Sequence, residues 1–242
     1  MRLLAIETAT GVTAIALWDG DDVREVIVDG ARRHTEVLAP AIATALDRAG
    51  WAVRDLDGIV VDVGPGLFTG LRVGIATAKG LAVASGAGLY AVTSTDTLAT
   101  AAREAGILGP VMAVVDARRG ELFVAGYDVG AGAPSPLFGP MVATPAALLD
   151  AIGQLSDQSA TGDPAGAVTA VGDGAVREAG LLASAGARVR EDLVVPSPGS
   201  AIRLVGSRIA EGQLALGHAD VHPVYLRAAD AVANFQVRGA PS

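Results

Sequence analysis

A glycine-rich run directly after an apolar stretch is the feature that most constrains how this chain folds. Residues 59–63, Ile-Val-Val-Asp-Val, have the pattern of a buried strand, and the glycine-rich run 64–82 follows at once. Its first glycines permit positive φ angles and close backbone approach, and Pro65 fixes one φ angle. Because a helix is predicted to begin near Leu71, strand, glycine loop and helix together aim backbone N–H groups at an anion or at a partner chain. The spacing matches neither of the two common nucleotide-binding glycine motifs.

Composition narrows the class of protein. The chain has 242 residues, of which 51% are hydrophobic, enough for one large domain or two small ones. The net charge of −8 disfavours binding of nucleic acid by the chain alone, and the absence of cysteine excludes disulfides, thiolate metal sites and a cysteine nucleophile. The apolar start is interrupted at Glu7, too early for a signal peptide, and no apolar run reaches the ~18 residues of a membrane span. We therefore expect a cytoplasmic protein that does not bind membranes.

The predicted elements follow the same order, β-β-β-α-β-α, in both halves of the chain. In the first half, strands are expected at 3–6, 12–18, 23–28, 59–63 and 88–92, and helices at 35–49, 71–85 and from about 94. In the second half, strands are expected at 111–115, 122–127, 140–143 and 167–171, and helices after Thr144, at 175–183 and at 201–212. Residues 156–166, rich in small and polar side chains, are expected to form a surface loop.

This repeated order predicts an α/β fold of two actin-like (ribonuclease H-like) lobes related by duplication. Each lobe is expected to hold a mixed five-stranded sheet with flanking helices. The N-terminal lobe, with the glycine loop, takes residues 1–106, the C-terminal lobe takes 107–227, and 228–242 form a tail. The helix at 201–212 is expected to pack back on the first lobe.

The first turn of each half carries an acid at a strand end and a glycine four residues later. These turns are 7–11, Glu-Thr-Ala-Thr-Gly, and 116–120, Asp-Ala-Arg-Arg-Gly. Facing acids could hold Mg²⁺ and a nucleotide, or each acid could only stabilise its own turn. Lys79 is the only lysine in the chain. The candidates for an anion, a nucleotide or a shared surface are Glu7, Thr8, Gly64, Gly66, Thr69, Gly70, Arg72, Lys79 and Asp116.

Five motifs, met in order along the chain, resemble the TsaB (YeaZ) family. They are the segments 4–10, 64–74, 78–82, 116–121 and 223–227, so that the resemblance spans roughly residues 2–227. This family is the glycoprotease-like branch of the actin and sugar-kinase superfamily. Its proteins serve in making threonylcarbamoyladenosine next to the anticodon of tRNAs that read codons beginning with A.

The resemblance implies a scaffold or activator rather than an enzyme. Family members dimerise with the catalytic relative TsaD, and the ATPase TsaE docks on the pair. A homodimer is the alternative for the isolated chain, and tRNA is reached only through the complex. No cofactor is expected in the chain alone, with ATP and Mg²⁺ only in the complex.

The resemblance also locates a missing metal site. TsaD carries two histidines in an H-x-x-x-H pattern just after the strand that follows the glycine loop. Here Ser94 and Leu98 occupy those places, and neither side chain can replace an imidazole at a transition metal. His218 and His222 have the same spacing, but Gly217 and Pro223 flank them and disfavour a helix, so we predict no metal site there. His34 is expected to be a solvated or capping residue.

The family pairs its subunits through a four-helix bundle, to which the helices 35–49 and 71–85 correspond. The predicted interface residues are Leu38, Ile42, Ala45, Val73, Thr77, Ala78 and Leu81. A different function stays open from the residues alone: an independent ATP-dependent small-molecule kinase or ATPase of the same fold.

Overall fold

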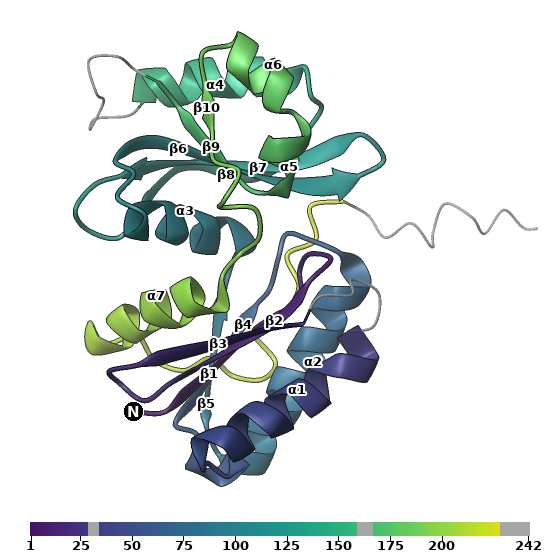
Figure 1. Ribbon diagram of the computed structural model, residues 1–242, viewed down its shortest axis with the longest axis vertical. Coiled ribbons are helices and arrows are strands. Elements are labelled where there is room, and N and C mark those ends of the chain that lie inside the picture. The colour runs from purple at the N-terminus through teal and green to yellow at the C-terminus, as the bar shows by residue number, and fades with distance from the viewer. Residues whose placement is uncertain (29–33, 159–166, 228–242) are drawn as a thin grey trace, which may run out of the picture.

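The computed structural model describes residues 1–28, 34–158 and 167–227, which form two lobes (Figure 1). The predicted tail, 228–242, and most of the predicted loop 156–166 lie outside these residues; the structure continues a helix through Gln158 instead. Among the described residues, no helix is both long enough and apolar enough to cross a membrane.

Each lobe is built on a five-stranded mixed sheet, and the two sheets share one plan. The N-terminal sheet has the order β3-β2-β1-β4-β5 and the C-terminal sheet the order β10-β9-β6-β7-β8. The first contains β1 (Leu3–Glu7), β2 (Thr13–Trp18), β3 (Val23–Val28), β4 (Gly58–Asp62) and β5 (Gly88–Val92). The second contains β6 (Gly109–Arg118), β7 (Glu121–Val129), β8 (Ser135–Ala143), β9 (Thr169–Val171) and β10 (Arg188–Val189).

In both sheets an antiparallel meander of three strands is extended by two parallel strands. This agreement confirms the predicted two-lobed, actin-like α/β fold.

The helices cover both faces of both sheets. They are α1 (His34–Ala49), α2 (Phe68–Ser85), α3 (Ser94–Glu104), α4 (Ala147–Gln158), α5 (Asp173–Arg177), α6 (Ala179–Ser184) and α7 (Pro198–Ala210), with a 3₁₀ turn, η1, at Val53–Asp55. Helices α1 and α2 cover the outer face of the N-terminal sheet, and α4 to α6 cover the outer face of the C-terminal sheet (Figure 1). The helix predicted over 175–183 is in fact two short helices, because Glu178, at φ −101° and ψ 21°, leaves helical geometry between them.

Helices α3 and α7 lie between the two sheets and are exchanged between the lobes (Figure 1). Helix α3 follows β5 along the chain, yet Leu98 and Ala102 pack with the inner side chains of β6, β7 and β9. Helix α7 follows β10, yet Ile202 and Val205 pack on β1, β2 and β4. A boundary at residue 106 therefore separates the two sheets along the chain, but each sheet is covered by a helix from the other side of that boundary.

The glycine loop packs against the turn between β1 and β2. The Leu67 N–H donates to the Ala9 carbonyl (2.6 Å), and the Thr8 hydroxyl donates to the Gly70 carbonyl (2.8 Å). A Cβ atom at Gly66 or Gly70 would overlap the carbonyl of Ala9 or Thr8, and one at Gly74 would overlap the Thr8 hydroxyl. These glycines are thus required by close approach to the chain's own backbone, and α2 begins at Phe68, earlier than predicted.

A matched pair of glycines in α2 tests this packing. Gly70→Ala places a methyl group against the Thr8 carbonyl, so we expect a loss of about 1–3 kcal/mol in the free energy of unfolding. Gly80→Ala adds its methyl group in open space, and we expect a gain of about 0.5–1 kcal/mol from helix propensity. Urea unfolding measures both, and equal effects of the two substitutions would contradict the packing argument.

Candidate functional site

Two buried carboxyl groups lie side by side at the end of the N-terminal sheet. Strands β1 and β4 are parallel, with Ile6 opposite Val61, so Glu7 and Asp62 come next to each other at the carboxyl ends of the strands. Their exposed fractions are 3% and 2%. Glu7 Oε1 accepts a hydrogen bond from the Ala9 N–H (2.7 Å). Glu7 was among the candidates predicted from the sequence, whereas Asp62, which ends the buried strand before the glycine loop, was not.

Burial and mutual repulsion change the protonation of this pair. Burial raises the pKa of Glu7 well above its usual range, and the neighbouring Asp62 raises it further. Burial also raises the pKa of Asp62, while hydrogen bonds from Glu7, the Gly64 N–H and the Ser94 hydroxyl oppose that rise. Glu7 is therefore the protonated member of the pair, and Asp62 Oδ2 is buried without a hydrogen-bond partner among the described residues.

Ser94 and Leu98, which the family resemblance aligns with the expected metal ligands of TsaD, have structural roles here. The Ser94 hydroxyl is fully buried and donates to Asp62 Oδ1 (2.9 Å), which also accepts from the Gly64 N–H (2.6 Å). Leu98 is fully buried in the apolar layer that also contains Val115. In the described part of the chain, no cluster of three or more histidine, aspartate or glutamate side chains is arranged to hold a metal ion.

The corresponding turn of the C-terminal lobe is an ion-pair network. The Asp116 carboxylate pairs with Arg118 (2.8 Å) and with Arg177, and its backbone N–H donates to Asp173 (2.8 Å). Arg118 and Arg119 both have positive φ, 64° and 55°, at the exposed tip of the hairpin. Asp116 is thus engaged by two guanidinium groups, and it belongs to a different network from Glu7.

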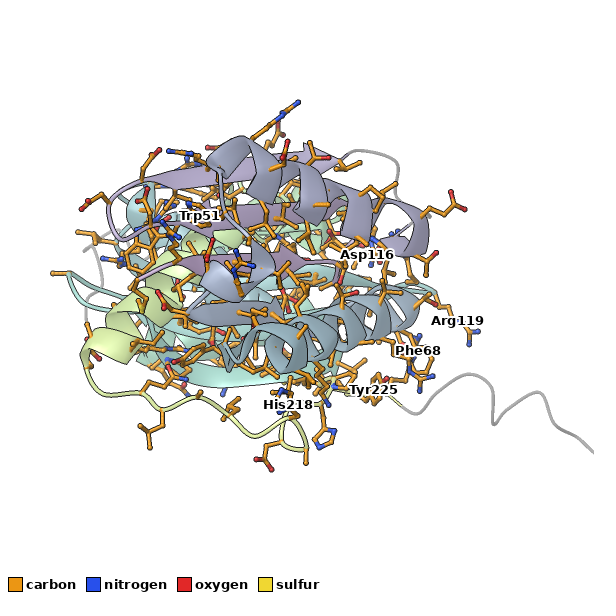
Figure 2. All side chains as sticks on the ribbon, turned by 90° about the horizontal axis from the view of Figure 1, so that it is seen from below. Trp51, Phe68, Asp116, Arg119, His218 and Tyr225 are labelled. Atoms are coloured by element: carbon orange, nitrogen blue, oxygen red, sulfur yellow. The ribbon has the colours of Figure 1, made fainter. Side chains whose placement is uncertain are left out.

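A cluster of aromatic and arginine side chains lies exposed beside the glycine loop (Figure 2). The Arg72 guanidinium carbon lies 3.7 Å from the centre of the Phe68 ring, and Arg72 Nε donates to the Tyr225 hydroxyl (2.9 Å). The rings of Phe68 and Tyr225 stack with centroids 5.2 Å apart. Of these three residues only Arg72 was predicted from the sequence, although Phe68 and Tyr225 lie within the motifs 64–74 and 223–227.

The remaining anion candidates are not brought together around one site. Thr8, Gly64, Gly66 and Gly70 form the contact between the turn and the glycine loop, with Gly64 at the acid pair. Thr69 is exposed in the first turn of α2, and Lys79 is half-buried further along that helix.

The structure corrects the choice of interface residues. Leu38, Ile42, Ala45 and Ala78 all point into the core between α1, α2 and the sheet, with exposed fractions of 8% or less. The periodicity of these helices identified the face toward the sheet, not a face toward a partner. Val73, Thr77 and Leu81 are half-buried and stay predictions. The outer face of α2 instead carries the exposed Ala76, Gly80 and Val83.

Two predictions for the histidines have different outcomes. His34 is not solvated: it is buried, with Nδ1 2.7 Å from the Thr13 hydroxyl oxygen. His218 and His222 are exposed in a segment that is not helical, as their flanking residues predicted.

Comparison with known proteins identifies the family. Residues 28–180 match the family model described as "TsaD: tRNA N6-adenosine threonylcarbamoyltransferase". The chain is 35% identical over 128 residues to the "tRNA threonylcarbamoyladenosine biosynthesis protein TsaB" of Escherichia coli, and 37% identical over 130 residues to the protein of that name in Bacillus subtilis. The chain belongs to the TsaD family, in its TsaB/YeaZ branch. The matches cover 53% of this chain, and the chain spans only 55% and 56% of the length of these two relatives.

Solved structures agree with this assignment. YeaZ from Pseudomonas aeruginosa has a TM-score of 0.76 and 26% sequence identity, with 93% of this chain and 99% of that chain covered. A second P. aeruginosa structure, described as an uncharacterized protein with similarity to peptidase YeaZ, has the same TM-score and 28% identity. The two-lobed fold is therefore that of the TsaB/YeaZ branch along nearly the whole chain.

The acid pair predicts how stability depends on pH. Because folding raises the pKa of Glu7, its protonation stabilises the fold fully below about pH 4.5, and that stabilisation is lost as the pH rises through the folded-state value. Glu7→Gln keeps an acceptor for the Ala9 N–H and a donor for Asp62 but cannot ionise. We expect the free energy of unfolding of the variant to exceed that of the wild type by an amount that grows between about pH 5 and pH 8, as measured by urea titration.

The exposed substitution Asp22→Asn serves as the control and should leave the wild-type pH profile unchanged. Parallel profiles for the wild type and Glu7→Gln would show that Glu7 is not the buried protonated acid.

Proposed function

We propose that the chain is a non-catalytic subunit of the machinery that makes threonylcarbamoyladenosine in tRNA. It would dimerise with a TsaD-like transferase and act as its scaffold or activator. The modified base would be the adenosine next to the anticodon in tRNAs that read A-starting codons. The observation that carries the proposal is the pair Ser94 and Leu98, which fill the places of the metal ligands with a committed hydroxyl and a core side chain.

The chemistry of the donor set supports a non-catalytic role. If the Ser94 hydroxyl turned toward a metal ion, an oxygen of the buried Asp62 would lose one of its hydrogen-bond donors. Leu98 offers no lone pair, and its isobutyl group fills space in the core. The names of the TsaB relatives support a role in tRNA modification, and the fold supports pairing with a partner protein.

The alternative, an independent ATP-dependent kinase or ATPase, has less support. Phosphates in such a fold would rest on backbone N–H groups of the two hairpin turns. Here the Ala9 N–H donates to Glu7, and the Asp116 carboxylate of the second turn is bound by arginines. The Ala9 N–H of the first turn and the Asp116 carboxylate of the second are thus engaged within the chain.

The outer face of α2 is the surface that best fits a partner helix. Ala76 and Gly80 are small and exposed, and Val83 is 72% exposed. Small residues allow two helices to approach closely, and about 800 Å² per partner suffices for a specific complex. The TsaD-like protein would occupy this face, in competition with a second copy of the chain, and a TsaE-like ATPase would join the pair. With a net charge of −8, the chain would meet tRNA only through the complex.

Reconstitution tests the function. The purified chain, the TsaD-like protein of the same organism, or both are incubated with tRNA, threonylcarbamoyl-adenylate and the TsaE-like ATPase with ATP. Mass spectrometry of the digested tRNA then measures the modified nucleoside. We expect none with the chain in place of the TsaD-like protein, and a marked increase when both are present. Modification by the chain alone, or steady ADP release from the chain alone, would overturn the proposal.

Substitutions on opposite faces of α2 test the interface. Ala76→Glu lies on the outer face, so we expect an unchanged melting temperature and about tenfold or greater weakening of the complex with the TsaD-like protein. Ala78→Glu would bury an unpaired charge and cost about 3–5 kcal/mol of folding free energy instead.

Leu149→Glu, on the exposed side of α4, is the charge-matched control and should leave the affinity unchanged. Analytical ultracentrifugation measures the complex, and an unaffected affinity for Ala76→Glu would remove the outer face of α2 from the interface.

A further inference from the structure

A pocket of about 220 Å³ lies where the chain crosses from the C-terminal sheet back to α7. Its floor is the inner face of the N-terminal sheet, where Glu7, Ala14 and Ile27 are directly opposite one another on β1, β2 and β3. Ala101 of α3 and the crossing segment 192–198 complete the wall. The small side chain of Ala14, in the middle of this row, leaves the space open.

All titratable groups that line the pocket are acids. They are Glu7, Glu25 and Asp192, and the lining contains no lysine, arginine or histidine. Glu25 Oε1 accepts hydrogen bonds from the Ser197 hydroxyl (2.6 Å) and from the Gly199 N–H (2.7 Å), both at the N-terminus of α7. These two donors at the N-terminus of α7 hold the Glu25 carboxylate in place in the wall of the pocket.

The other ionisable groups near the pocket are either neutral or paired with other residues. Asp192 is paired with Arg190 (2.6 Å), and Glu7 is the protonated member of the acid pair. Arg203 interacts with Glu25 but is held by both oxygens of Glu104 (2.8 Å each) and lies outside the lining. A phosphate or carboxylate ligand would therefore meet net repulsion in this pocket.

The rest of the lining is apolar. Val12, Ala14 and Ile27 form the sheet side, and Val194, Val195 and Pro196 form part of the crossing segment. The volume is below the ≈ 300–1,000 Å³ usual for pockets that hold drug-sized ligands, so the occupant must be small. Apolar walls with one fixed carboxylate suit a short aliphatic chain that ends in a cation.

We propose that this pocket is a binding site for a small organic cation, an alkylammonium or alkylguanidinium. Its aliphatic part lies on Ala14 and Ile27, and its charged head pairs with Glu25. Because the wall combines the N-terminal sheet, α3 and the crossing segment, an occupant also ties the two lobes together. The proposal is independent of the role in tRNA modification.

Three four-carbon ligands that differ in charge test the site on the full chain. n-Butylamine, n-butanol and butyrate are titrated separately, and methyl chemical shifts report binding at Val12, Ile27 and Val194. We expect butylamine to bind in the millimolar range, butanol more weakly and butyrate not at all. Equal binding of butylamine and butyrate, shifts confined to other residues, or no binding of butylamine would overturn the proposal.

Two variants separate charge from shape. Glu25→Gln keeps an oxygen that accepts from Ser197 and Gly199 but removes the charge, so we expect about fivefold weaker binding of butylamine with that of butanol unchanged. Ala14→Val fills the floor of the pocket with a residue suited to a strand and should abolish binding of both ligands.

Asp22→Asn removes one exposed acid of the β2–β3 hairpin outside the lining and serves as the control for net charge. Equal effects of Glu25→Gln and Asp22→Asn would mean that only the overall charge of the chain matters, and the site assignment would be wrong.

Discussion

The contact between the β1–β2 turn and the glycine loop is the constraint on which the rest of the N-terminal lobe depends. Thr8 and Ala9 lie so close to the backbone at Gly66 and Gly70 that no side chain fits between them. This approach fixes the start of α2 against the end of β1. It thereby sets the place of the acid pair on one side and of Arg72, with its aromatic neighbours, on the other.

The same contact also engages the polar groups of the β1–β2 turn within the chain. A turn that cradles phosphate must keep its backbone N–H groups available. In this chain the Ala9 N–H donates to Glu7, the Ala9 carbonyl accepts from Leu67, and the Thr8 hydroxyl donates to the Gly70 carbonyl. These polar groups are thus engaged in contacts within the N-terminal lobe.

The order of elements could be predicted from the sequence because apolar periodicity and turn residues are local signals. The residues that a side chain contacts in three dimensions could not be predicted in this way. Glu7 and Asp62 are 55 positions apart, and only the parallel register of β1 and β4 brings them together. The spacing of Leu38, Ile42 and Ala45 marks one apolar face, but a sheet and a partner helix demand the same pattern. Likewise, the exchange of α3 and α7 depends on packing between lobes, which no local pattern records.

That exchange bears directly on whether the lobes can move. Domain closure in two-lobed folds needs the elements between the lobes to slide or hinge. Here Glu104 of α3 binds Arg203 of α7 through both oxygens and also accepts from the Ser200 hydroxyl (2.7 Å). At the other end of α3, the Tyr127 hydroxyl donates to Asp96 (2.9 Å) and ties the helix to β7.

At the glycine loop, the segment after α7 makes a further link between the lobes. The Val224 N–H donates to the Val63 carbonyl (2.7 Å), and Arg227 pairs with Glu121 (2.6 Å) on β7. Sliding of one lobe past the other would therefore break contacts both in the α3–α7 layer and in this segment. A chain cross-linked in this way presents its outer helices in a fixed geometry, which would reduce the entropy lost in the pairing proposed above.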